Sequence, residues 1–223
     1  MSSPSAPAAS PAAPAQRFAL RHVQLSRAAI AAIAAIMITF SGDHSAAVGL
    51  AVFSGFGIAT ALVLFAAGWL TYPAGRRAAP VSIGAFSLVA GMLAGVGPWR
   101  SSALFFGIII VWALTTGVIE LVAGLRDRRR AEVPRPEARD TLTVGVITLA
   151  LAAGTSLVPA GYALEYTIAE ADATYTLTGT VIAVGVFGAY AAIVAVYLAI
   201  AGFSPRQPVA ASTPEPARSE DHA

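Results

Sequence analysis

Six stretches of this 223-residue chain carry no charged side chain, and this feature makes a membrane the expected environment of the chain. A hydrocarbon core about 30 Å thick requires roughly 20 apolar residues at a rise of 1.5 Å each. Five stretches meet that length, and the first meets it if its helix begins near Leu25 and Arg27 extends its charged end to the interface. The stretches are residues 28–42, 46–70, 78–99, 101–119, 141–164 and 173–205. The sequence therefore predicts an all-α polytopic membrane protein with six transmembrane helices.

The arginines predict the orientation of these helices. Thirteen of the fourteen lie before the first stretch, between the second and third, between the fourth and fifth, or after the sixth, and only Arg100 lies elsewhere. Loops rich in basic residues stay in the cytoplasm, so both termini are expected there. The isoelectric point of about 9.3 then reflects topology. The expected partner is the lipid bilayer, and no nucleic-acid partner is expected.

Composition excludes several kinds of chemistry. The chain has no cysteine and no lysine, which excludes disulfides, thiolate metal sites, Schiff bases and the lysine of a phosphate-binding loop. No catalytic, cofactor or metal motif is present, and we do not expect an enzyme. Arginine without lysine, with abundant alanine, glycine and valine, is typical of a GC-rich bacterial coding sequence. The expected location is therefore the plasma (inner) membrane of a bacterium.

The two ends differ in composition from the rest of the chain. Both are rich in serine, proline and alanine, which bury too little apolar surface to fold. We expect residues 1–22 and 204–223 to be cytoplasmic tails and residues 23–203 to form the transmembrane domain. A secretory signal is the competing interpretation, because Arg27, the apolar residues 28–40 and the small residues 45–47 imitate its three regions.

An internal repeat predicts how the helices are connected. Gly84, Leu88 and Pro98 of the third stretch recur 61 residues later as Gly145, Leu149 and Pro159. The natural interpretation is three consecutive helical hairpins of the same orientation. Each would turn outside, at residues 43–44, 98–100 and 160–175.

One segment also resembles a known family. Residues 112–125, WALTTGVIELVAGL, followed by Arg126 and further arginines, are similar to the fourth span of the short-repeat membrane proteins typified by the bacterial acid-resistance protein HdeD. The resemblance implies a six-span inner-membrane protein built from repeated hairpins, and links to acid stress in particular members. It supplies no catalytic residues.

Glu120 is the first candidate functional residue, because a carboxylate among apolar residues of a membrane span is costly and marks a functional site by default. Only five residues separate it from Arg126, roughly 8 to 9 Å of helix, so we expect it near the cytoplasmic interface. There it would pair with the arginines of residues 126–130. A proton or ion site, or a pH-sensitive switch, is the alternative.

A second candidate lies on the outer face. Asp43 and His44 could gather there with Glu165, Glu170 and Asp172, and a histidine among carboxylates can sense acid or hold a cation loosely. The alternative is that Asp43 and His44 only form a turn.

Small residues predict close helix packing. Gly91 and Gly95 form a Gly-x-x-x-Gly pair, and Gly117 and Gly124 lie on the fourth span. Packing within one chain is the first expectation, and a homo-oligomer is the alternative.

Two function classes compete. One is a small non-enzymatic membrane protein contributing to acid or envelope stress, as the family resemblance implies. The other is a small transporter or channel using Glu120. No substrate is indicated, and the absence of an obvious pair of intramembrane charges favours the first class.

Overall fold

The computed structural model describes residues 20–168 and 173–204, and it contains six long helices, as predicted. All six are long and apolar enough to cross a membrane, so the chain is a multi-pass membrane protein. The helices are α1 (Leu20–Thr39), α2 (Ala46–Leu70), α3 (Ala78–Gly95), α4 (Ser102–Asp127), α5 (Arg135–Leu157) and α6 (Gly179–Phe203). Two 3₁₀ turns, η1 (Ala74–Arg76) and η2 (Gly97–Trp99), precede α3 and α4, and the strands β1 (Ala163–Ile168) and β2 (Ala173–Thr178) precede α6.

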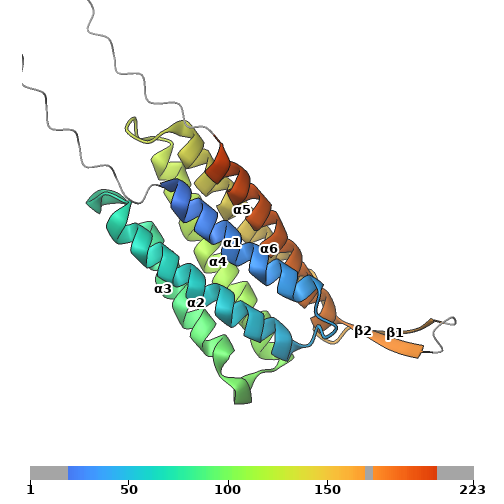
Figure 1. Ribbon diagram of the computed structural model, residues 1–223. Coiled ribbons are helices and arrows are strands. Elements are labelled where there is room, and N and C mark those ends of the chain that lie inside the picture. Colours follow the sequence, from blue (N-terminus) through green and yellow to red (C-terminus); the bar gives the residue numbers. More distant parts are fainter. Residues whose placement is uncertain (1–19, 169–172, 205–223) are drawn as a thin grey trace, which may run out of the picture.

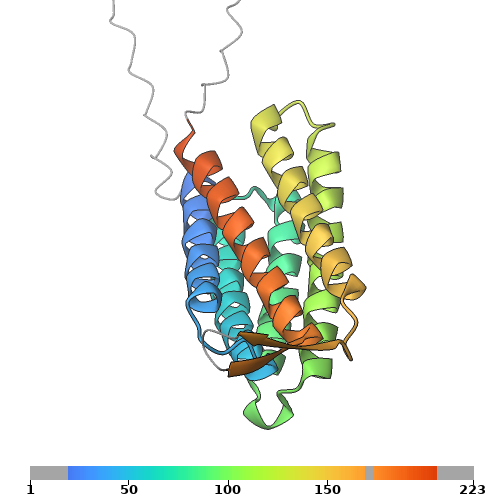
Figure 2. The same ribbon diagram turned by 90° about the vertical axis from the view of Figure 1, so that its right-hand side faces the viewer.

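The helices run side by side between two chemically different ends of the bundle (Figures 1 and 2). The first end holds the start of α1, the end of α6, η1 and the α4–α5 connection, and we call it the arginine-rich end. The second holds η2 and the two strands, and we call it the hairpin end. Among the described arginines only Arg100 lies at the hairpin end. The bundle therefore has the charge asymmetry that the sequence predicts.

The helices that start at the hairpin end share one capping device. Ser45, Ser101 and Thr178 precede α2, α4 and α6, and each side-chain oxygen accepts a hydrogen bond from the backbone N–H three residues later. Such caps satisfy one of the free donors at a helix start. This recurrence agrees with three consecutive hairpins, each with its turn at the hairpin end.

The six helices form a closed ring in which tight and loose contacts alternate. The most extensive contacts join α2 to α3, α4 to α5, and α6 back to α1. The contacts within the hairpins α1–α2, α3–α4 and α5–α6 are smaller. The two helices of each hairpin are consecutive in the chain, but each helix packs most closely against a helix of the neighbouring hairpin. The same pattern occurs three times around the ring.

Glycines make the three tight contacts possible. A Cβ atom added at Gly91 would lie 3.0 Å from the backbone of α2, one at Gly145 would lie 2.8 Å from the Leu121 nitrogen of α4, and one at Gly188 would lie 2.7 Å from Ile38 of α1. Close backbone approach of this kind is how membrane helices associate where lipid removes the hydrophobic driving force. The four glycines named from the sequence also lie at these contacts: Gly91 and Gly95 against α2, and Gly117 and Gly124 against α5.

An aromatic cluster fills the middle of the ring. It consists of Phe53 and Phe56 from α2, Trp112 from α4, and Phe187 and Tyr190 from α6. Their ring centroids lie 5.2 to 6.5 Å apart, mostly edge to face, which is the favoured arrangement of aromatic pairs. The buried indole N–H of Trp112 donates to Ser87 Oγ at 3.0 Å. The centre of the bundle is therefore packed.

Three boundaries differ from the sequence prediction. Residues 160–175 were expected to be a loose turn before a span that starts at residue 173, but β1 and β2 form an antiparallel β-hairpin that ends at Thr178, and α6 starts at Gly179. Alternating leucine or tyrosine with threonine or glutamate is a period-two pattern, and a search for uncharged stretches does not detect it. Helices α1 and α5 start earlier than expected, at Leu20 and Arg135, because their charged first turns lie at the polar end of the bundle. The two expected tails lie largely outside the described residues.

Candidate functional site

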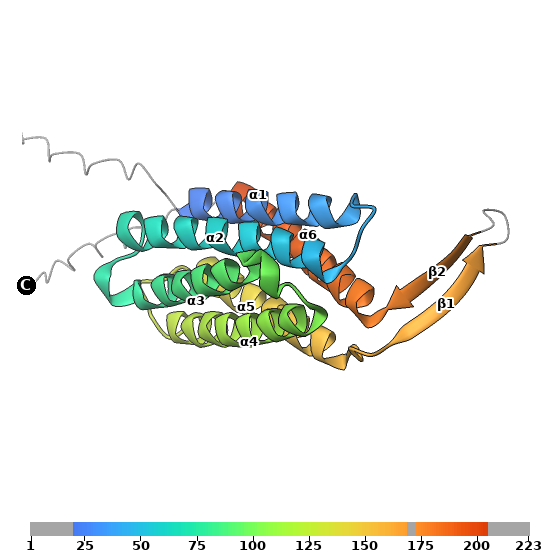
Figure 3. The same ribbon diagram turned by 90° about the horizontal axis from the view of Figure 1, so that it is seen from below.

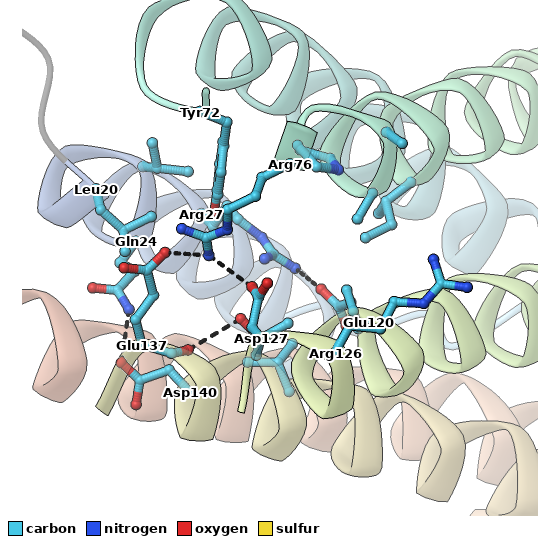
Figure 4. Close-up of a pocket in the computed structure, with 18 of the residues that line it drawn as sticks. Leu20, Gln24, Arg27, Tyr72, Arg76, Glu120, Arg126, Asp127, Glu137 and Asp140 are labelled. Carbon is cyan, nitrogen blue, oxygen red and sulfur yellow. Dashed lines mark hydrogen bonds and ion pairs between the residues drawn. The ribbon is translucent and has the colours of Figure 1, made fainter. Parts of the chain in front are cut away.

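A cavity of about 140 Å³ opens at the arginine-rich end of the bundle (Figure 4). Its walls come from α1, η1, α3, α4, α5 and the end of α6. This volume accommodates several water molecules or one small solute, since a water occupies about 30 Å³ of liquid. Four arginines and four carboxylates line it: Arg27, Arg76, Arg126, Arg130, Glu120, Asp127, Glu137 and Asp140. The lining is strongly charged but balanced in sign.

Glu120 forms a buried ion pair at the inner end of this cavity. Arg27 of α1 donates from Nη2 to Glu120 Oε1 at 2.7 Å. Only 4 % of the Glu120 side chain is exposed, against 19 % of the Arg27 side chain. A buried charge is tolerated when it is paired and hydrogen-bonded, and here the two charges supply each other's partner.

The expected partner of Glu120 was wrong. The arginines of residues 126–130 share its helix or follow it, yet the bond is made by Arg27, 93 residues earlier in the chain. Arg27 was expected to extend toward lipid headgroups, but its side chain turns inward. The expectation that no pair of intramembrane charges exists is also wrong, and the absence of such a pair can no longer be used as an argument against transport. The only signal in the sequence was that one basic and one acidic residue each adjoin an apolar stretch, which does not identify a pair by itself.

The second oxygen of Glu120 meets a hydroxyl that has competing partners. Thr148 Oγ1 of α5 lies 3.4 Å from Glu120 Oε2, 2.8 Å from the Val144 carbonyl oxygen and 3.2 Å from the Tyr190 hydroxyl. A threonine hydroxyl carries one proton, so at any one time it can donate to either the Glu120 carboxylate or the closer Val144 carbonyl oxygen, while the Tyr190 hydroxyl can act as donor or acceptor. The carboxylate therefore depends on Arg27 for its main stabilisation.

A second ion-pair network surrounds Arg76 in η1. Its Nη2 lies 2.6 Å from both Asp127 Oδ2 at the end of α4 and Glu137 Oε1 at the start of α5. Burial alone would lower the pKa of Arg76, but the hydrogen bonds to these two carboxylates outweigh it and raise the pKa. Burial, with a contribution from the Glu137 charge, raises the pKa of nearby Tyr72 to about 12. Arg76 thus joins the α2–α3 connection to both α4 and α5.

Asp140 links three helices through neutral donors. Gln24 Nε2 of α1 donates to Asp140 Oδ2 at 2.9 Å, and the Tyr197 hydroxyl of α6 donates to Oδ1 at 3.0 Å. None of Arg76, Asp127, Glu137 and Asp140 was singled out as a candidate from the sequence. Their polar character at helix ends is ordinary, and only the folded bundle shows that they face one cavity.

The polar region narrows beyond the ion pair. A void of about 10 Å³ follows, with Arg27, Glu120, Thr148 and Tyr190 among its walls. That volume suits a single water molecule at most. The aromatic cluster lies next, so the cavity ends at the ion pair and does not continue to the hairpin end in this conformation.

The predicted outer-face group does not assemble within the described residues. Asp43 accepts hydrogen bonds from the Ser45 nitrogen at 2.8 Å and the Ser45 hydroxyl at 2.9 Å, so it forms the turn before α2, with His44 between them. Glu165 lies on β1, opposite Thr176. Glu170 and Asp172 lie outside the described residues. Within residues 20–168 and 173–204 there is no group of three or more histidine or acidic side chains placed to hold a metal.

Comparison of the chain with protein-family models, with curated proteins and with solved structures finds no match. The resemblance of residues 112–126 to the HdeD-like proteins therefore stays a prediction. The geometry of the cavity and its ion pair is the main guide to function.

Proposed function

We propose that this chain is a non-enzymatic, acid-responsive protein of the bacterial plasma membrane, with both termini in the cytoplasm and Glu120 as its proton-sensitive group. The orientation is supported by the arginines, since basic segments stay cytoplasmic. Reporter fusions test it: a fusion after residue 223 is expected to be active in the cytoplasm and one between residues 168 and 173 outside. The opposite pattern would contradict the orientation.

The carrying observation is the buried Arg27/Glu120 ion pair at the inner end of a charged cavity. Protons reach Glu120 through this cavity from the arginine-rich end. Protonation removes the negative charge that holds Arg27, and the guanidinium then moves toward the water of the cavity. An ion pair that is stable only when the acid is ionised is a simple means of coupling pH to conformation.

The position of the ion pair within the ring explains how its loss would spread. Arg27 belongs to the tight pair α1/α6 and Glu120 to the tight pair α4/α5, so the bond crosses between two pairs. The hydrogen bonds of Gln24 and Tyr197 to Asp140 cross at the same place. Glycine contacts hold each pair together without regard to pH, whereas polar contacts hold the pairs to one another at the arginine-rich end. Acid therefore weakens the polar contacts between the helix pairs and leaves the glycine contacts within each pair intact.

Groups on every neighbouring helix affect this response. Glu120 contacts Arg27 from α1 and the Thr148 hydroxyl from α5, and that hydroxyl in turn contacts the Tyr190 hydroxyl from α6. Arg126 and Asp127 lie nearby on α4 and line the same cavity. Arg27 is the closest charge and the one whose freedom changes when Glu120 becomes neutral.

Distance measurements test the conformational part. Arg21 and Arg128 are exposed at the arginine-rich end, near the two sides of the ion pair, and the chain has no native cysteine. Spin labels at Arg21→Cys and Arg128→Cys are expected to show a longer or broader distance distribution in acid than at neutral pH. With Glu120→Gln the acid distribution should already be present at neutral pH. An unchanged distribution in both cases would contradict the proposal.

Genetics tests the physiological part. A strain lacking the gene is expected to survive acid or envelope stress less well than the parent, without losing uptake of any one nutrient. Glu120→Gln should fail to complement it, whereas His44→Ala and Glu165→Gln at the hairpin end should complement it. Complementation by Glu120→Gln would contradict the role of Glu120.

Transport is the second candidate. The cavity at the arginine-rich end and the small void beyond it share Arg27 and Glu120 in their walls. A polar route thus reaches the aromatic cluster from one side. Transport would require Phe53, Phe56, Trp112 and Phe187 to separate. Proton or ion flux in proteoliposomes that Glu120→Gln abolishes would favour this candidate over a sensor.

A further inference from the structure

The β-hairpin before α6 has two chemically different faces. Leu164 is paired with Leu177 and Tyr166 with Tyr175, so these four side chains share one face. The pairs Glu165 with Thr176 and Thr167 with Thr174 share the other face, where the two threonine hydroxyls lie 3.1 Å apart. The hairpin is therefore amphipathic, with an apolar and aromatic face opposite a hydroxyl and carboxylate face.

The apolar face is largely uncovered by the rest of the described chain. The Tyr166 and Tyr175 rings stack with centroids 5.8 Å apart, yet the two residues are 46 % and 47 % exposed, and Leu164 is 49 % exposed. A lone two-stranded ribbon is marginally stable in water and needs its apolar face covered. A partner for this face is consequently expected.

The base of the hairpin is joined rigidly to the membrane-spanning helices. Strand β2 ends at Thr178 and α6 begins at Gly179, with no linker between them. The Gly179 N–H donates to the Tyr162 carbonyl at 2.9 Å, and a Cβ at Gly179 would collide with the Pro159 carbonyl oxygen. Only glycine permits this close crossing of the two ends of the hairpin. The hairpin direction is thus set by α5 and α6.

The hairpin leaves the bundle at an angle to the helices instead of continuing their direction (Figures 1 and 3). It starts at the level where the spans end, and the exposed aromatic residues Phe40 and Trp99 also lie at this end. For helices that span a bilayer, the level at which they end is the boundary between hydrocarbon and lipid headgroups. Tyrosine is enriched there because its ring is apolar and its hydroxyl is polar.

We infer that the face formed by Leu164, Tyr166, Tyr175 and Leu177 rests on the headgroup layer of the membrane leaflet at the hairpin end. Lipid is the partner because the face begins where the spans end, at the same end of the bundle as the exposed Phe40 and Trp99, and combines leucine with tyrosine. The opposite face, with Glu165 and three threonines, stays in water, where its carboxylate is solvated. The hairpin would act as a lateral support that fixes the tilt of α6 relative to the bilayer.

Adjacent residues on the two faces provide matched probes. Single cysteines at Tyr166 and Thr167 carry a spin label, and the purified full-length protein is reconstituted into vesicles of phosphatidylethanolamine and phosphatidylglycerol. Oxygen concentrates in the bilayer and a nickel chelate stays in water, so the ratio of their accessibilities reports depth. The ratio at Tyr166→Cys is expected to exceed that at Thr167→Cys several-fold, and the difference should disappear in a lipid-free amphiphilic polymer.

A second pair protects the test against disturbance of the tyrosine stack. Leu164→Cys and Glu165→Cys sit on the same two faces and should reproduce the difference. Equal, water-like ratios at all four positions in vesicles would overturn the inference. Magnetic broadening at Tyr166→Cys that grows with the protein-to-lipid ratio would also overturn it, because a second copy of the chain would then cover the face.

Discussion

Replacing Arg27 by methionine removes the main partner of Glu120 and leaves a carboxylate with only 4 % of its side chain exposed. The remaining contact is the Thr148 hydroxyl at 3.4 Å, whose proton is also shared with the closer Val144 carbonyl oxygen at 2.8 Å. Breaking a buried ion pair by removing one charge costs about 3 to 5 kcal/mol. We expect Arg27→Met to lower the stability by that amount, which for a chain of this size corresponds to a fall in Tm of roughly 6 to 20 °C.

Replacing the other partner, Glu120→Gln, is expected to lower the stability less than Arg27→Met does. Glu120→Gln leaves Arg27 without a counter-charge, but the Arg27 side chain is 19 % exposed and borders the cavity, where water can solvate it. An expected loss of about 1.5 to 3 kcal/mol follows from one charged hydrogen bond exchanged for water. The double variant Arg27→Met with Glu120→Gln should lie within about 1 kcal/mol of the natural protein, because neither charge is then stranded.

Thermal unfolding in detergent measures the stability of the natural protein, the two single variants and the double variant. It is followed by the fluorescence of the buried Trp112 and the other two tryptophans. Glu165→Gln on the exposed strand is the control and should change the stability by less than about 0.5 kcal/mol. Acid should partly restore Arg27→Met, because protonation neutralises the stranded carboxylate. Equal losses in the two single variants, or strictly additive losses in the double variant, would refute the assignment of the bond as a buried and mutually dependent ion pair.

Three further predictions concern the surroundings of the site. Arg76→Met removes the shortest ion-pair contacts of Asp127 and Glu137 and should lower Tm more than Arg77→Met, because Arg77 contacts two uncharged groups, the Tyr72 carbonyl oxygen and the Trp69 ring. Gly145→Ala should lower Tm by forcing α4 from α5, whereas Gly185→Ala, where no atom lies within 4 Å of the added carbon, should leave Tm unchanged. The absorbance change at 295 nm should show Tyr72 ionising near pH 12, above its usual pKa of 10. The stability that its protonated form contributes is intact below pH 10 and is lost as the pH rises through about 12. Tyr72→Phe should abolish that loss of stability.

The sequence alone determined the class of the fold. Hydropathy and the distribution of arginines predict six spans and two chemically different ends, because both are properties of consecutive residues that a bilayer acts on directly. The hairpin repeat and the packing glycines at 91, 95, 117 and 124 were visible for the same reason. Glu120 stood out as a charge in an apolar stretch without any knowledge of its neighbours.

Only the tertiary structure decided which residues meet. Hydropathy does not set the rotation of a helix about its axis, and the glycine contacts that pack α4 against α5 turn Glu120 toward Arg27 instead of toward the arginines on its own helix. The close pairing of α6 with α1 brings the two ends of the described chain together and completes the ring, which no local pattern encodes. The amphipathic hairpin was missed because its apolar residues alternate with a period of two, whereas every uncharged stretch of the sequence was interpreted as a helix. Contacts between residues far apart in sequence depend on how the helices pack in three dimensions, and for that physical reason the candidate site could be located only in the folded protein.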